Sequence, residues 1–191
     1  MTIKQQELDF FSKFPIPQAD FVQDGVVDEQ TYLSSNLKIL FLLKEPNSNI
    51  GGWKLIDHVR SDAQARTFDN LARWAKGICN LQIEIPWIEI KDISPRTNSL
   101  NSVMLFNLKK TPGGKATDEN ELARVASKYS DLLKKQSSFY NPDIVICCGY
   151  AVVRLFDQIL FANTVPWPST TRGIQYREFQ RNKYGKEILK K

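Results

Sequence analysis

The sequence predicts an α/β protein, a three-layer sandwich with a central, mainly parallel four-stranded sheet and helices on both faces. Two observations predict this class. Three apolar runs resemble buried strands, and segments with helical spacing of apolar residues fill the intervals between them. Strands that alternate with helices are typical of parallel pairing through right-handed crossovers. We expect residues 1–191 to form a single domain, because a chain of this length buries one core well.

The three expected central strands are continuously apolar, as strands buried on both faces are. They are residues 38–43, 103–106 and 143–148. A fourth strand is expected over residues 186–191. Either this strand is an edge at which the protein ends, or the sequence stops short of its natural end.

Apolar residues at helical spacing predict three helices. The second follows Asp118 and Glu121, which are spaced like a capping box, and the third follows Gly149. The three apolar faces contain Phe68, Leu71, Ala72, Ala75 and Ile78; Leu122, Val125, Ala126, Tyr129, Leu132 and Leu133; and Val152, Val153, Phe156, Ile159 and Leu160. Residues 1–36 are expected to pack on the core as an N-terminal arm, and residues 82–100 to form a loop excursion with at most a short edge strand.

The positive charge of the protein lies at the end of the sequence. The net charge is +5, and the basic segment 172–191 carries that whole excess. Basic side chains with aromatics between them favour nucleic acid as a partner, and a solvated terminal segment is the alternative. We therefore expect Arg177, Arg181 and Lys183 to contact the phosphate backbone of DNA or RNA.

Composition also excludes several classes of protein. The longest apolar runs have five residues, whereas a membrane-spanning helix needs about 20, and no signal-peptide core is recognisable. We expect a cytoplasmic protein without a membrane span. One histidine and three cysteines, with no Cys-x-x-Cys, predict neither a metal site nor a cofactor. Protein partners cannot be predicted from the sequence.

The loop after the first strand is the expected functional loop. Lys44 and Glu45 directly follow that strand, and ligands in such sheets bind at the carboxyl ends of the strands. Pro46 fixes the turn. A carboxylate at this position could orient or deprotonate a water molecule, and the alternative is a solvated glutamate at an ordinary strand exit.

Further residues near these strand ends are expected to contact a ligand. Asn47 lies in the first loop, and Trp53 follows two glycines there and is expected to be a stacking surface. Gly149 follows the third strand and leads into a helix whose backbone N–H groups could meet an anion. A tight turn without a ligand is the alternative for Gly149.

The loop after the second strand begins with Asn107. An asparagine side chain offers a donor and an acceptor to a base edge, and the alternative is that it only caps its own turn. Lys109, Lys110 and Lys115 are expected to contact the nucleic-acid backbone. Gly113-Gly114-Lys115 is not a nucleotide-binding phosphate loop, because an alanine follows where the motif needs Ser or Thr.

Taken in order, these segments resemble the uracil-DNA glycosylase superfamily. Its members have a strand that ends in a Gly-Gln-Asp-Pro-like loop, then a strand that leads into an asparagine, and later an Asn-Pro-led strand that ends in glycine. The counterparts are Leu43-Lys44-Glu45-Pro46, Leu105-Phe106-Asn107-Leu108-Lys109-Lys110-Thr111-Pro112-Gly113-Gly114, and Asn141-Pro142-Asp143-Ile144-Val145-Ile146-Cys147-Cys148-Gly149. The resemblance covers residues 37–160.

The resemblance implies roles for two residues. Glu45 matches the acid that positions the attacking water, with glutamate in place of aspartate, and Asn107 matches the residue that reads the flipped base. Such enzymes extrude the nucleotide and hydrolyse its N-glycosidic bond. The family's His-Pro-Ser-like loop after the final strand has no counterpart here, because the one histidine, His58, lies between the first and second strands.

Two functions follow as expectations. The first is a uracil-DNA glycosylase-like protein that recognises a base in nucleic acid and hydrolyses its N-glycosidic bond. The second is a non-catalytic module of the same fold that binds a nucleotide, a nucleic acid or a protein. A small-molecule hydrolase that uses Glu45 is a third, less specific option.

Overall fold

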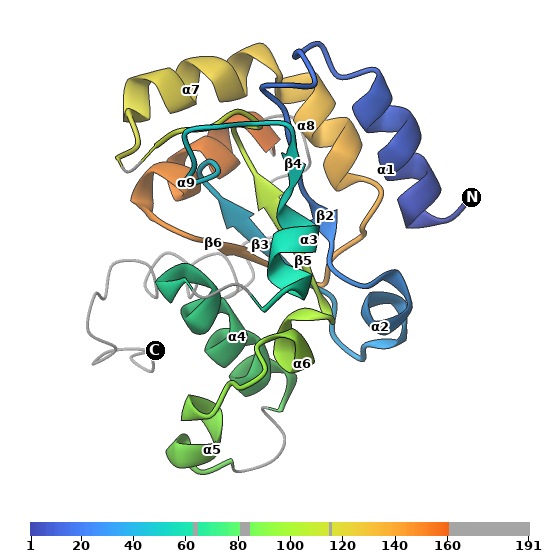
Figure 1. Cartoon of the computed structure of the whole chain (residues 1–191), viewed down its shortest axis with the longest axis vertical. Coiled ribbons are helices and arrows are strands. Elements are labelled where there is room, and N and C mark those ends of the chain that lie inside the picture. Colours follow the sequence, from blue (N-terminus) through green and yellow to red (C-terminus); the bar gives the residue numbers. More distant parts are fainter. Residues whose placement is uncertain (63–64, 81–84, 115, 161–191) are drawn as a thin grey trace.

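The centre of the molecule is a four-stranded sheet in the order β2-β5-β3-β6 (Figure 1). The structure, a computed structural model, describes residues 1–62, 65–80, 85–114 and 116–160. The sheet consists of β2 (Gly25–Val26), β3 (Ile39–Leu43), β5 (Val103–Asn107) and β6 (Ile144–Cys147). β3 pairs in parallel with both β5 and β6, and β2 is antiparallel to β5. The predicted α/β class with a mainly parallel four-stranded sheet is confirmed.

The fourth strand is not the expected one. β2 lies within residues 1–36, so this region contributes an edge strand of the sheet in addition to packing on the core. Two residues give no periodic signal in a sequence, and one of them is Gly25, at φ +138°. The strand expected at 186–191 lies outside the residues that the structure describes.

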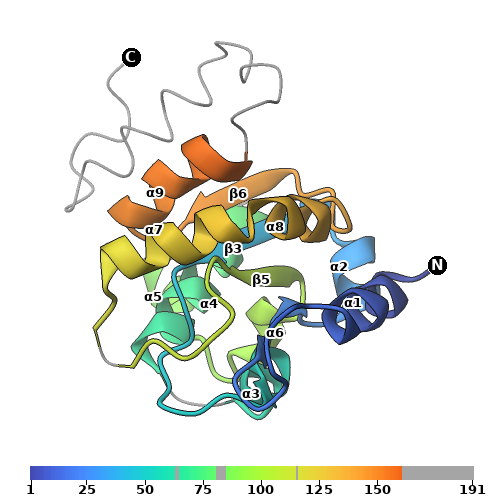
Figure 2. The same cartoon turned by 90° about the horizontal axis from the view of Figure 1, so that it is seen from above.

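Helices pack against both faces of the sheet. The helices of the described residues are α1 (Ile3–Ser12), α2 (Glu29–Ser34), α3 (Leu55–Arg60), α4 (Arg66–Cys79), α5 (Trp87–Lys91), α6 (Thr97–Leu100), α7 (Glu119–Lys128), α8 (Ser130–Ser137), α9 (Tyr150–Leu155) and the π-helical turn η1 (Phe156–Leu160). Leu40 and Leu42 pack with α7, α8 and α9, whereas Ile39, Phe41 and Leu43 pack with α3, α4 and α6. Figure 2 shows these two groups of helices on opposite sides of the strands.

Two helical regions differ from their expectation. The helix expected through Leu133 is divided into α7 and α8 at Tyr129, whose φ of −107° and ψ of 18° are not helical. In the described part of residues 82–100, the structure has α5 and α6 and no strand. The predicted apolar faces nevertheless point inward, because Phe68, Leu122 and Val152 are all buried.

The N-terminal region forms its own aromatic cluster. Phe10, Phe11, Phe14 and Phe21 are buried together. The chain then forms β1 (Val22–Gln23), which pairs in parallel with β4 (Trp53–Lys54) in a small second sheet. This pairing joins the N-terminal region to the end of the loop at residues 44–53. No helix in the described ranges is long and apolar enough to cross a membrane.

Asp118 caps α7, as the sequence predicted for the start of that helix. Its side chain accepts hydrogen bonds from the N–H groups of Asn120 and Glu121, at 2.9 and 3.1 Å. We expect Asp118→Ala to lower the free energy of unfolding by about 1 kcal/mol, because two N–H groups lose their acceptor. Urea denaturation measures the change, and Asp118→Ser, which retains a capping oxygen, should restore most of it.

Candidate functional site

The loops that follow β3 and β5 form one layer at the carboxyl edge of the sheet. Leu43 and Asn107, the last residues of the two strands, are in register. Beyond them the backbone pairing continues, and four more hydrogen bonds of 3.0 Å connect the loops. They run from Leu108 N to Leu43 O, from Lys109 N to Lys44 O, from Gly113 N to Pro46 O and from Gly114 N to Ser48 O. The two predicted loops are therefore held together by their main chains.

Glu45 lies in this layer with its side chain only 5% exposed. Its Oε2 is 2.9 Å from Lys109 Nζ, and the same ammonium is 3.3 Å from Glu121 Oε1. Burial by itself would lower the pKa of Lys109, but its hydrogen bonds and ion pairs with the two carboxylates outweigh burial and raise that pKa. Lys109 is therefore a cation held against Glu45.

Gly113 leaves the space that Glu45 occupies. A Cβ atom at residue 113 would overlap the carboxyl group of Glu45. The backbone of Gly113 is held in place by its hydrogen bond to Pro46 O. A glycine is required here because the carboxylate packs directly on the main chain.

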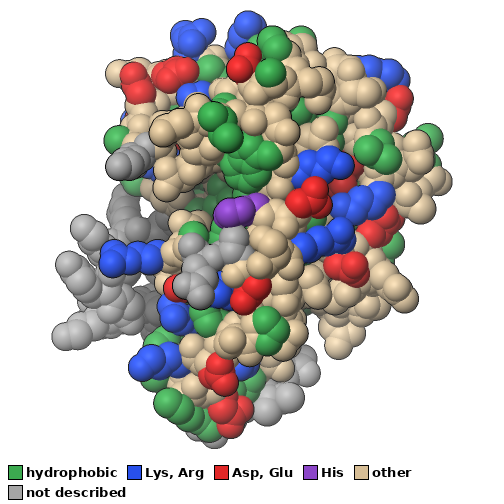
Figure 3. Space-filling model, in the orientation of Figure 1, with side chains coloured by type: hydrophobic (Ala, Val, Ile, Leu, Met, Phe, Trp, Pro, Cys, Tyr) green, Lys and Arg blue, Asp and Glu red, His purple; other side chains and the backbone are tan. Residues whose placement is uncertain are grey.

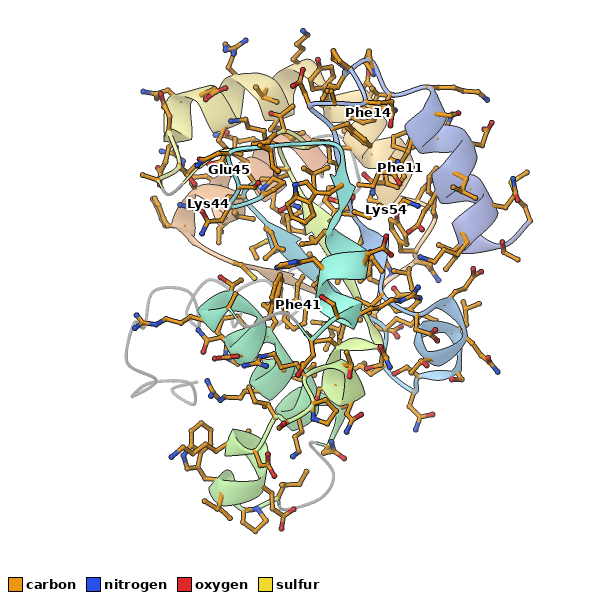
Figure 4. All side chains as sticks on the ribbon, viewed as in Figure 1. Phe11, Phe14, Phe41, Lys44, Glu45 and Lys54 are labelled. Atoms are coloured by element: carbon orange, nitrogen blue, oxygen red, sulfur yellow. The ribbon has the colours of Figure 1, made fainter. Side chains whose placement is uncertain are left out.

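The side chain of Lys44 lies next to Gly149, which follows strand β6. Figure 4 shows Lys44 and Glu45 together at the end of β3, away from Phe41. Lys44 Nζ is 3.6 Å from Glu119 Oε1. A Cβ on Gly149 would lie 3.3 Å from Lys44 Cε, and Gly149 has a φ of +124°. The structure thus brings Lys44, Glu45, Asn107 and Gly149 to one edge of the sheet.

Asn107 is buried, with 1% of its surface exposed. Its Nδ2 has no hydrogen-bond partner among the residues that the structure describes. A buried donor without an acceptor costs about 1–3 kcal/mol, so this nitrogen is an unusual feature of the site.

The carboxylate of Asp24, in the N-terminal region, binds the backbone N–H of Asn107. Its side chain is fully buried and accepts three hydrogen bonds: from Asn107 N at 2.6 Å, from Lys110 Nζ at 2.6 Å and from Gln136 Nε2 at 2.8 Å. Lys110 Nζ also lies 4.0 Å from the centre of the Phe106 ring. Burial lowers the pKa of Lys110, and the charge of Asp24 opposes that shift.

The buried network continues toward α1. Gln136 Nε2 also donates to the hydroxyl of Tyr140, which donates to Glu7 Oε1 at 3.1 Å. Glu7 accepts a second hydrogen bond from Val26 N, at 2.9 Å. Burial raises the pKa of Glu7 despite these hydrogen bonds and the nearby ammonium of Lys4. The network connects the N-terminal region to the end of β5.

Three aromatic rings lie next to one another at the end of the first loop: those of Trp53, His58 and Phe68. The indole of Trp53 is half-buried, and its Nε1 donates to Ile50 O at 2.8 Å. The ring of His58 is 5.7 Å from Trp53 and 5.8 Å from Phe68, centre to centre. His58 is exposed. Trp53 is therefore fixed in orientation by one hydrogen bond and one edge-on ring contact.

Two of the residues expected to contact phosphate, Lys109 and Lys110, have a different environment from the expected one. Lys109 and Lys110 are buried and paired with carboxylates, so their ammonium groups already have anionic partners. Lys115, Arg177, Arg181 and Lys183 lie outside the described residues. On the face shown in Figure 3, basic and acidic side chains are interspersed. Asn47 is exposed and Pro46 is buried.

The site offers a carboxylate and an amide, and no reactive thiol. Burial raises the pKa of Cys148, next to Gly149, to about 12, so this thiol is protonated at neutral pH and is a poor nucleophile. Within the described ranges, no group of three or more His, Cys, Asp or Glu side chains is arranged to bind a metal ion. The arrangement fits orientation of a water molecule by Glu45 and donation of a hydrogen bond by Asn107.

The sequence analysis did not identify Asp24 and Gln136 as site residues. Asp24 was recognisable in principle, since it is an acidic residue among apolar ones at positions 21–27. Gln136 gives no such signal, because a glutamine on a helix is ordinarily exposed. Both became apparent only from the packing of α8 and the N-terminal region against β5.

Comparison of the chain with protein-family models, with curated proteins and with solved structures finds no match. The function is therefore inferred from the residues of the chain and their geometry.

Proposed function

We propose that the protein recognises a nucleobase in DNA or RNA and hydrolyses its N-glycosidic bond, as the resemblance to the uracil-DNA glycosylase superfamily implies. The observation that carries the proposal is the buried Nδ2 of Asn107, which has no partner among the described residues and lies at the end of β5, while the buried carboxylate of Glu45 follows the paired strand β3. A base carbonyl oxygen is an acceptor that would satisfy this donor. The protein acts, in this proposal, in the cytoplasm and on a three-layer α/β frame.

The chemistry assigns one role to each residue. The C1′–N bond breaks, and its electron pair leaves with the base while positive charge develops on the sugar. A hydrogen bond from Asn107 Nδ2 stabilises the negative charge that gathers on the base oxygen. Glu45 orients a water molecule whose oxygen bonds to C1′, and the carboxylate accepts the proton that this water loses. The proton is then transferred to the departed base or to solvent.

Trp53 provides the apolar surface in this proposal. An extruded base needs a stacking partner, and a base on an aromatic ring gains about 1–3 kcal/mol. The indole of Trp53 is held in one orientation by Ile50 O and His58. A surface that is already ordered loses little entropy on binding.

The experiment that tests the proposal is base release from defined oligonucleotides. The protein is incubated with single-stranded and duplex DNA that contain one uracil, and abasic sites are detected by alkaline cleavage. We expect Glu45→Gln to lower the rate about 100-fold, because glutamine cannot accept the proton from water. The proposed hydrolysis is contradicted if the wild-type protein releases no base. The proposed role of Glu45 is contradicted if Glu45→Gln retains full activity.

Glu121→Gln is the matched control for Glu45→Gln. Glu121 is the second carboxylate that pairs with Lys109, and its side chain is half-exposed. The variant therefore replaces a carboxylate by an amide, as Glu45→Gln does, but at a partly exposed position. Partly exposed ion pairs contribute little, so we expect the activity to remain within about fivefold. If Glu121→Gln lowered the activity as much as Glu45→Gln, the loss would come from the removal of an ion pair with Lys109. It would then not show a specific role of the Glu45 carboxylate.

A second function is binding without turnover. One observation favours it: the ion pair with Lys109 already occupies Oε2 of the buried Glu45 carboxylate. A binding module would retain nucleic acid, with an affinity that falls as salt rises, and would release no base. The same oligonucleotides, used in a gel-shift assay beside the cleavage assay, separate the two functions.

A further inference from the structure

The ammonium of Lys109 lies between two carboxylates. Its Nζ is 2.9 Å from Glu45 Oε2 and 3.3 Å from Glu121 Oε1. The side chains of Lys109 and Glu45 are 6% and 5% exposed, whereas that of Glu121 is 45% exposed. Ordering a long lysine side chain in the interior costs conformational entropy and hydration. The protein therefore maintains a buried ion pair at the residue that we propose as the water-orienting group.

The main chain fixes both partners of this ion pair. Lys109 N donates to Lys44 O at 3.0 Å, so the backbone of Lys109 is joined to the residue next to Glu45. Gly113 lies directly against the carboxyl group of Glu45, and Gly113 N donates to Pro46 O at 3.0 Å. The carboxylate of Glu45 is thus bounded by main chain at Gly113 and by the ammonium of Lys109.

The two oxygens of the Glu45 carboxylate have different surroundings. Oε2 has the ammonium of Lys109 as its partner. Oε1 has no hydrogen-bond donor among the residues that the structure describes. A water molecule that approaches this carboxylate therefore finds Oε1 as the available acceptor, because Oε2 already faces a cation.

We propose that Lys109 is a positioning residue, whose ammonium holds Glu45 Oε2 and so fixes Oε1 as the acceptor of the proton from the attacking water. This role rests on the hydrolytic function proposed above. In that step the oxygen of water bonds to C1′, the electron pair of the C1′–N bond leaves with the base, and the proton of the water passes to Oε1. Lys109 acts through Glu45 and contacts neither the sugar nor the base.

Rates of base release separate this role from a purely structural one. Release of uracil from single-stranded DNA is measured at increasing protein concentration for the wild-type protein, Lys109→Met and Lys109→Arg. We expect Lys109→Met to lower the maximal rate about 10- to 100-fold, because the carboxylate loses its fixed orientation. The half-saturating protein concentration should stay unchanged, since the contacts to nucleic acid remain. Lys109→Arg retains the charge and should keep more of the rate than Lys109→Met.

A double-substitution cycle with Glu45→Gln tests whether Lys109 acts through Glu45. In the Glu45→Gln background, Lys109→Met should change the remaining rate by less than about threefold, because the carboxylate that Lys109 positions is already absent. The double variant also leaves no unpaired charge at this buried pair. If Lys109→Met alone does not fold, the comparison of the double variant with Glu45→Gln decides the question.

Lys13→Met is the matched control for Lys109→Met. Lys13 pairs with Asp9 at 2.6 Å, and its side chain is 71% exposed. The same chemical change at this exposed ion pair should leave both the maximal rate and the half-saturating concentration as in the wild-type protein. Thermal melting of each variant shows whether it is folded at the temperature of the assay.

The possible outcomes separate the positioning role from the function on which it rests. A wild-type protein that releases no base refutes the hydrolytic function, and the positioning role with it. Release by the wild-type protein, with an equal or higher rate in folded Lys109→Met, refutes the positioning role alone. An equal loss from Lys109→Met with and without Glu45 also refutes it, because Lys109 would then act independently of that carboxylate. A loss that occurs only in the presence of Glu45 supports it.

Discussion

Asp24→Asn is expected to lower the free energy of unfolding by roughly 3–5 kcal/mol, the largest stability effect that we expect of one substitution. Asp24 has a fully buried side chain, and its partner Lys110 is 1% exposed. Asparagine leaves the buried ammonium of Lys110 without the carboxylate that pairs with it directly. Breaking a buried pair by removing one partner is more costly than the net value of the pair.

Urea denaturation and thermal melting measure this change. A loss of 3–5 kcal/mol corresponds to a decrease in the melting temperature of roughly 6–20 °C for a chain of this size. Asp9→Asn is the matched control, because Asp9 pairs with Lys13 at 2.6 Å and is 58% exposed. We expect a change below about 1 kcal/mol there. Equal effects of the two substitutions would contradict the buried-pair assignment.

The double substitution Asp24→Leu with Lys110→Met tests whether the unpaired charge of Lys110 causes the loss of stability in Asp24→Asn. It removes both charges together, so it leaves no unpaired ion in the core. Apolar replacements of a whole buried pair are often neutral or stabilising, although here Asn107 N and Gln136 Nε2 would lose their acceptor. We expect the double variant to be more stable than Asp24→Asn. A double variant that is less stable would show that the hydrogen bonds matter more than the charge.

Gly113→Ala is expected to reduce base release on the order of 1,000-fold while it changes no charge. The added methyl group overlaps the carboxyl group of Glu45, which must move and leave Lys109. Misplacement of a catalytic group by about 1 Å lowers the reaction rate about 100-fold. A displaced carboxylate also no longer accepts the proton from water, which lowers the rate further. The buried side chains must also repack, which costs about 1–3 kcal/mol of stability.

Gly77→Ala provides the matched control for this prediction. Gly77 lies inside α4, and a Cβ there meets nothing within 4 Å. The same substitution should therefore stabilise the protein by about 0.5–1 kcal/mol, because alanine favours the helix, and leave base release unchanged. Full activity of Gly113→Ala would contradict the placement of Glu45 against residue 113 and would also weaken its assigned role.

Much of the sheet was predictable because its central strands are buried on both faces. Residues 39–43 and 103–107 are almost entirely apolar, and such runs are distinct from helical patterns even without an alignment. The edge strand β2 was not predictable in this way, because it consists of two residues and is held by Met104 and Leu105, which are distant in sequence. Edge strands this short depend on tertiary contacts.

The candidate site was predictable in position and not in its interactions. The rule for the carboxyl ends of parallel strands identified Glu45 and Asn107, and the structure brings the ends of their strands into register. Sequence spacing gave no indication that Lys109 pairs with Glu45, since adjacent loops meet only when β3 and β5 pair. The role of Glu45 and Asn107 in base release stays a prediction until it is measured.

The strand order has a consequence for synthesis of the chain. β3 lies between β5 and β6, and both of these partners are translated after it, at residues 103–107 and 144–147. The ribosome therefore releases the apolar strand Ile39–Leu43 well before either neighbour exists, and β2 likewise waits for β5. Sheets built from such distant pairings fold slowly, and their unpaired apolar strands are prone to aggregate. During synthesis, the strand Ile39–Leu43 therefore lacks both of its central neighbours until residue 147 has been translated.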